Sequence, residues 1–172
     1  MKQLVFMYNY MLSDKWQKKS KLPLQFISFA YMRGKLYRIE DNYIGIDFTS
    51  KKHKWNDDKV YGALFLLDES EFYLRTLDGI MGCSLTSLRE NHIMDYMHRQ
   101  KVEITPIHFK NIIEFAQLNY EEKEEIKCFA YIGNMDNKFI QNKVNNTYQN
   151  RIKCGYDEKC FIDLLTKYKN IT

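Results

Sequence analysis

Apolar and polar positions along the chain predict a fold rich in strands. Residues 4–8 and 60–67 are short apolar runs, which are typical of buried strands. From residue 36 to residue 48, apolar and polar residues alternate, as expected of strands with one face in water. Residues 96–104 and 126–132 have a similar strand character. Together these segments predict about six strands.

Helix signals are fewer, and they lie between and after the predicted strands. Asp68 and Glu71 have the spacing of a capping box for a short helix over 72–77. The Thr-Pro pair at 105–106 is typical of a cap followed by a first helical turn, and it predicts a helix that continues to residue 118. Because strands outnumber helices and do not alternate with them, the pattern predicts an α+β fold. We expect a closed or partly closed mixed sheet with peripheral helices.

The length of the chain, 172 residues, corresponds to about one domain. We therefore expect a single domain over residues 1–172, with a core over about 4–132. The apolar spacing of the last segment predicts a helical extension over about 140–170.

Composition and charge narrow the classes of function. The 26 Lys and Arg against 22 Asp and Glu give a net charge of +4, which is too mild to indicate a nucleic-acid partner. No stretch approaches the ~20 apolar residues of a membrane span, and the first residues lack a signal-peptide pattern. The four cysteines are scattered without a C-x-x-C pair, as is typical of free thiols in a reducing compartment. We therefore expect a cytoplasmic protein with no membrane partner.

General catalytic motifs are missing from the sequence. It contains no phosphate-binding glycine loop, no nucleophile elbow and no H-E-x-x-H. The four histidines do not share the spacing of metal ligands on a helix. We therefore expect neither a metal nor a cofactor.

Several short motifs occur in an order that is informative as a set. They are the apolar run that ends in Tyr8-Asn9-Tyr10-Met11, A-Y-M-R-G-K-L-Y at 30–37, V-Y-G-A-L-F at 60–65, L-D-G-I-M-G at 77–82, and the strands at 96–104 and 128–132. This order resembles the gamma-glutamylcyclotransferase-like family over roughly residues 4–132. The resemblance implies an α+β fold with a mixed β-barrel and peripheral helices. It also implies an enzyme that needs no metal or cofactor and cyclises a γ-glutamyl amide to 5-oxoproline, releasing the amine.

The sequence departs from the family at two places that the reaction needs. The family's catalytic Glu corresponds to Met81, whose thioether cannot exchange a proton. In the substrate loop, Asn9 replaces a glycine and Tyr10 replaces a small Ser or Thr. Asn can adopt the left-handed backbone of glycine, but Tyr10 would fill the space of the glutamyl group. Loss of a general base alone typically slows a reaction ~10²–10⁴-fold.

The preferred interpretation is a non-catalytic protein that sequesters or senses a small ligand in the family pocket. An aromatic lining favours a planar ligand, such as a nucleotide-like signalling molecule. The Lys-, Asn-, Ile- and Tyr-rich composition is typical of an AT-rich genome, and a viral counter-defence sponge is one setting for such a protein. The predicted ligand-binding residues are Tyr8, Asn9, Tyr10, Met11, Tyr37, Tyr43, Tyr61 and Met81.

Three alternatives stay open. The tyrosines can simply be core residues. The chain can be an active cyclotransferase with a displaced carboxylate from Asp78, Glu90 or Asp95, although Asp78 is expected to sit at a structural corner on backbone amides. The chain can also be a protein–protein interaction module that uses the charged loop 51–58 or the C-terminal helices.

Overall fold

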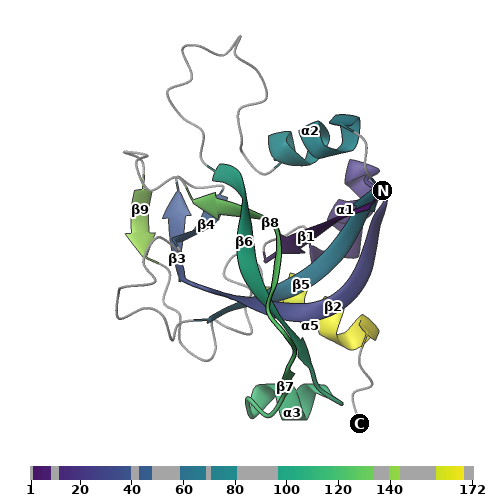
Figure 1. Cartoon of the computed structure of the whole chain (residues 1–172), viewed down its shortest axis with the longest axis vertical. Coiled ribbons are helices and arrows are strands. Elements are labelled where there is room, and N and C mark those ends of the chain that lie inside the picture. The colour runs from purple at the N-terminus through teal and green to yellow at the C-terminus, as the bar shows by residue number, and fades with distance from the viewer. Residues whose placement is uncertain are drawn as a thin grey trace.

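Five strands close into a mixed barrel in the computed structural model of the chain (Figure 1). β1 pairs antiparallel with β5 and parallel with β8, whereas β2 lies between β5 and β6. Antiparallel pairing of β6 with β8 completes the circle. The predicted mixed barrel is therefore confirmed. The barrel strands are β1 (Lys2–Met7), β2 (Leu24–Arg33), β5 (Lys59–Asp68), β6 (Met97–His108) and β8 (Ile126–Gly133).

Further strands extend the sheet beyond the barrel. β4 (Tyr43–Asp47) pairs parallel with β8, and β3 (Lys35–Ile39) lies between β4 and β9 (Ile140–Lys143). The short β7 (Glu121–Glu122) pairs with β6. The structure describes residues 2–8, 12–39, 43–47, 59–68, 71–80, 97–133, 140–143 and 158–168. These residues contain nine strands, whereas the sequence pattern predicted about six.

Four helices lie around the barrel in the described residues: α1 (Asp14–Ser20), α2 (Glu71–Ile80), α3 (Ile112–Ala116) and α5 (Glu158–Tyr168). They cover different sides of the barrel, with α2 and α3 at opposite ends in Figure 1. α5 buries Leu164 and Leu165, and its Tyr168 ring stacks on Phe26 of β2 at 3.9 Å between centroids. None of these helices is long and apolar enough to cross a membrane.

The helix predicted from residue 106 is wrong in its position. Thr105 and Pro106 lie inside β6, and the helix begins at Ile112 instead. The residue before a proline favours extended backbone, so the same pair also suits a strand. The N-cap is Asn111, whose side-chain oxygen accepts a hydrogen bond from the Glu114 backbone N–H at 2.9 Å.

Two other helix predictions need correction. A capping box needs its Glu at the third position of the helix, but α2 begins at Glu71, so the predicted capping box is wrong. The Glu71 carboxylate instead pairs with Arg75 one turn later at 2.6 Å. The helix also continues to Ile80, beyond the predicted 72–77. The extension over about 140–170 is not helical throughout, because Ile140–Lys143 forms β9, whereas α5 confirms a helix near its end.

Candidate functional site

The end of β1 leads into the predicted substrate loop, and Tyr8 fixes that end to the barrel. Its side chain is fully buried and its ring stacks on Phe6 at 5.9 Å between centroids. Its hydroxyl donates a hydrogen bond to the backbone carbonyl of Tyr131 in β8. The end of β1 is therefore held by this side-chain hydrogen bond as well as by the backbone pairing with β5 and β8.

Gly62 allows β5 to approach this end of β1. An added Cβ at this position would lie 2.1 Å from the carbonyl oxygen of Met7 and 3.0 Å from the ring of Phe6. A backbone oxygen inside a sheet cannot move aside without breaking the ladder, so glycine is required here. The glycine of the V-Y-G-A-L-F motif thus has a physical role next to the predicted loop.

Tyr61 precedes this glycine and is also buried. Its hydroxyl lies 2.7 Å from that of Tyr120, and its ring packs edge-to-face on Phe115 at 5.0 Å. Tyr8 directly follows β1 and Tyr61 lies in the neighbouring β5, and both are packed inside the protein with their hydroxyls hydrogen-bonded. This burial agrees with the interpretation of these two tyrosines as core residues, and their contact with a ligand stays a prediction.

The other predicted ligand-binding residues are described only in part. Tyr37 lies opposite Gly45 and Tyr43 opposite Ile39, so the two tyrosines belong to the paired strands β3 and β4 beside β8. Outside the described residues lie the loop 51–58 and the predicted residues Asn9, Tyr10, Met11, Met81, Glu90 and Asp95.

Asp78 is the displaced-carboxylate candidate that the structure does place. Its carboxylate lies between α2 and the barrel, where Nη1 of Arg99 contacts its two oxygens at 3.0 and 3.1 Å. The Tyr131 hydroxyl donates to Oδ1 at 2.7 Å. The Asp78 and Arg99 side chains are only 15% and 29% exposed. Among the described residues its partners are therefore two side chains, where the sequence predicted backbone amides.

These contacts favour a structural interpretation of the Asp78 carboxylate, and its role as a displaced base stays a prediction. A general base must accept the substrate's proton, and a carboxylate that does so loses its charge. Protonation of Asp78 would remove the ion pair with Arg99 and leave a partly buried guanidinium without its counter-charge. The hydrogen bonds instead link α2 to β6 and β8, and Tyr131 joins this cluster to Tyr8 and the end of β1.

Sequence reasoning missed both partners of Asp78. Arg99 and Tyr131 lie 21 and 53 positions away from it in the chain. They are direct partners in the β6–β8 ladder, so their meeting depends on that register. The only sequence signal was that each lies in a predicted strand.

A second polar cluster joins β7 to the barrel. The Tyr31 hydroxyl donates to Oε1 of Glu122 at 2.8 Å, and Nζ of Lys59 lies 3.3 Å from the Tyr120 hydroxyl. Burial raises the pKa of Tyr31, so its hydroxyl keeps its proton. Burial alone would lower the pKa of Lys59, but the bond to Tyr120 and the neighbouring Tyr31 and Glu122 raise it overall. A neutral phenol and a charged ammonium suit a structural clamp rather than proton transfer.

Nucleophilic and metal chemistry find no support in the described residues. The thiol of Cys128 is free and buried, and burial raises its pKa to about 12, so it stays protonated. Within the same residues, no three His, Cys, Asp or Glu side chains are placed to hold a metal ion.

Comparisons with known proteins place the fold. No protein-family model matches the sequence, and no curated protein matches it. Among solved structures, an AIG2-like protein of Mus musculus matches with a TM-score of 0.53 at 16% identity, over 91% of this chain and 94% of its own. YkqA from Bacillus subtilis matches with a TM-score of 0.50 at 14% identity, over 89% of this chain.

The share of the matched proteins that is covered differs widely. The chain spans only 42% of YkqA. A structure named gamma-glutamyl cyclotransferase matches with a TM-score of 0.48 at 14% identity, over 100% of this chain and 90% of its own. Identities this low show the fold alone. The chain is an α+β protein with a closed mixed barrel, and its fold is similar to that of the AIG2-like protein, in agreement with the fold that the resemblance to the gamma-glutamylcyclotransferase-like family implied.

Proposed function

We propose that this chain is a non-catalytic small-molecule-binding protein, which sequesters or senses its ligand on a gamma-glutamylcyclotransferase-like fold. The first support is the sequence, because Met81 stands where the resemblance implies the catalytic Glu. A thioether cannot deprotonate the substrate's amino group, and this proton transfer must precede attack on the γ-carbonyl.

The observation that carries the proposal is the environment of Asp78. This carboxylate lies three positions before Met81 in the sequence and is the natural substitute for the missing base. It is bound instead by Arg99 and Tyr131. An enzyme that used Asp78 as its base would have to break the contact that anchors α2 to the barrel.

The ligand favoured by this proposal is small, planar and able to stack. Because Tyr8 and Tyr61 are packed inside the protein, the predicted residues Tyr10, Tyr37 and Tyr43 are the remaining candidates for stacking on the ligand. A nucleotide-like signal is the ligand class that such a surface suits. A protein that withdraws such a signal without degrading it would act as a sponge, as a viral counter-defence protein does.

Mass spectrometry of the purified protein tests the proposal. Native spectra should show a bound small molecule, and denaturation should release it chemically unchanged. Tyr10→Ser restores the small residue of the family loop and should reduce retention of the ligand, whereas the control Tyr73→Ser on α2 should not. Recovery of a stoichiometric protein partner with no small molecule would favour the interaction-module alternative instead.

A further inference from the structure

The short helix α1 and its C-cap carry four lysines within seven positions of the chain. They are Lys15, Lys18, Lys19 and Lys21. All four are exposed, and α1 buries none of its own side chains in the core. Figure 1 shows the helix on the outside of the barrel. This helix therefore adds little to the core and presents its charge to the surroundings.

Helical spacing places three of these lysines and one aromatic ring on a continuous face. Lys15 is three positions from Lys18 and four from Lys19, so the three side chains are neighbours on the helix surface. Trp16 borders them, with its ring centre 4.8 Å from Nζ of Lys19 and 37% of the residue exposed. These four residues, together with Lys21 at the C-cap, form the lysine face.

The carboxylates around α1 do not neutralise the lysine face. Asp14 and Lys18 have the spacing of a helical ion pair, but both Asp14 oxygens bind Nζ of Lys167 in α5 at 2.9 and 3.0 Å. Asp163 of α5 lines a hollow together with Lys15 but forms no ion pair with it. Among the described residues, no carboxylate pairs with any lysine of this face.

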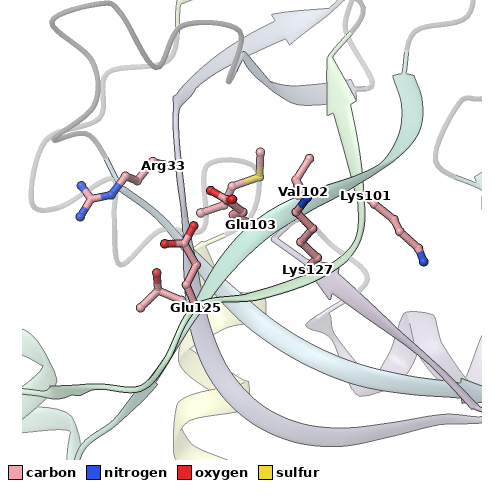
Figure 2. A pocket seen from close by; sticks show the side chains of 8 residues that line it. Arg33, Lys101, Val102, Glu103, Glu125 and Lys127 are labelled. Atoms are coloured by element: carbon pink, nitrogen blue, oxygen red, sulfur yellow. The ribbon is translucent and has the colours of Figure 1, made fainter.

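The surface of the barrel shows the opposite arrangement. Lys101 of β6 and Lys127 of β8 line one pocket together with Glu103 and Glu125, as Figure 2 shows. Lysines and glutamates are thus mixed on the barrel, whereas the lysine face carries charge of one sign.

The helix macrodipole explains only part of the charge on α1. Lys18 and Lys19 lie in the last turn, where a positive charge interacts favourably with the helix C-terminus. Lys15 lies in the first turn, where the same interaction is unfavourable, and it has like charges three and four positions away. This concentration of charge is therefore unfavourable in the isolated chain, and a binding partner of opposite sign would offset it.

The spacing of the lysine face fits an extended acidic segment. Neighbouring side chains on the helix surface are about 5–6 Å apart at Cβ, and alternate residues of an extended chain are roughly 6.6 Å apart. Carboxylates at every second position can therefore meet successive lysines. The face contains no arginine, whose planar guanidinium suits bidentate binding of phosphate. Its Trp16 ring is next to Lys19, which leaves less surface for stacking of nucleic-acid bases.

We propose that the lysine face is a docking surface for an acidic segment of another protein. The segment lies extended along α1, with carboxylates at alternate positions against the ammonium groups of Lys15, Lys18 and Lys19. The contact is small and largely electrostatic, so binding is transient and sensitive to salt. This surface does not depend on the proposed function, because none of its residues belongs to the predicted ligand-binding set.

Fluorescence anisotropy on the intact protein tests this surface. The probe is a labelled peptide of alternating Glu and Ser, and the matched control peptide has Gln in place of every Glu. At about 50 mM salt, the acidic peptide should bind with a Kd below about 0.5 mM, about tenfold or more tighter than the Gln peptide. About 300 mM salt should weaken its binding about tenfold or more. A peptide with the same Glu content in one block should bind less tightly.

Two triple variants with the same change in net charge assign the binding to α1. The lysine-face variant combines Lys15→Gln, Lys18→Gln and Lys19→Gln, and it should weaken peptide binding about tenfold or more. The control variant combines Lys101→Gln, Lys110→Gln and Lys127→Gln, which are exposed positions outside α1, and it should bind within about threefold of the wild type. Circular dichroism checks that both variants fold.

The contrary outcomes are distinct. Equal affinity for the acidic and the Gln peptides, or equal weakening by the two folded variants, would overturn the docking surface. Equal binding of the block peptide would overturn the extended arrangement of alternate carboxylates. A single-stranded oligonucleotide or anionic lipid vesicles that bound more tightly than the peptide, and lost this binding in the lysine-face variant, would replace the acidic segment by a phosphate-bearing partner.

Discussion

Gly62 is the residue on which the meeting of β1 and β5 depends most directly. Gly62→Ala places a methyl group against the Met7 carbonyl, which has no free space to move into. We expect a loss of about 1–3 kcal/mol in the free energy of unfolding, measured by urea denaturation. Gly79→Ala, at an exposed position in α2, is the control and should gain about 0.5–1 kcal/mol. Equal effects of the two substitutions would contradict the close approach.

The largely buried ion pair of Asp78 and Arg99 should contribute more to stability than the exposed ion pair of Glu71 and Arg75. Asp78→Asn removes the charge that faces Arg99 while it keeps the shape of the side chain, and we expect a loss of about 1.5–3 kcal/mol in unfolding free energy. The exposed pair of Glu71 and Arg75 offers a comparison on the same helix, and Glu71→Gln should cost no more than about 0.5 kcal/mol. If Asp78→Asn proved as mild as Glu71→Gln, the carboxylate would not anchor α2.

Cys128 predicts a pH dependence at the alkaline end. Burial raises the pKa of its thiol from 9.0 to about 12, so the folded protein retains a proton that the unfolded chain loses. The resulting stability is complete below pH 9.0 and is lost as the pH rises toward about 12. Above pH 9.0, the wild type should therefore lose stability more steeply than Cys128→Ala, by up to about 1.4 kcal/mol per pH unit. Parallel slopes in denaturation at several pH values would contradict this.

At the scale of elements, α5 is predicted to be integral to the fold. Leu165 is fully buried and Tyr168 stacks on β2, although the helix lies far from the barrel strands in sequence. Leu165→Ala should cost about 2–5 kcal/mol in unfolding free energy. Ile113→Ala, at an exposed position of α3, should change it by no more than about 0.5 kcal/mol. A small effect of Leu165→Ala in the same denaturation series would show that α5 is only an appendage.

The elements that the sequence predicted well are those with a local signal. β1, β5 and β8 correspond to apolar runs, because a strand buried in the barrel needs apolar residues on both faces. The prediction at Thr105-Pro106 was wrong because the same two residues suit both an extended strand and the start of a helix. Only the pairing of β6 with β2 decides between them, and that pairing joins residues more than seventy positions apart.

At the scale of the whole molecule, the order of motifs predicted the barrel but not its polar contacts. Closure requires β1 to pair parallel with β8, and no local pattern encodes such a pairing. The Asp78 cluster likewise depends on the β6–β8 register, because that register brings Arg99 and Tyr131 together. Sequence reasoning could therefore name Asp78 as a candidate, but it could not find its partners Arg99 and Tyr131.

The central claim is that the barrel keeps the shape of a cyclotransferase without its chemistry. Release of 5-oxoproline from a panel of γ-glutamyl amines and peptides, quantified by mass spectrometry, tests it most directly. The account predicts no release above the rate without protein, for the wild type and for Asp78→Asn alike. Release by the wild type that is abolished in Asp78→Asn, Glu90→Gln or Asp95→Asn would contradict it and identify the carboxylate that performs the reaction.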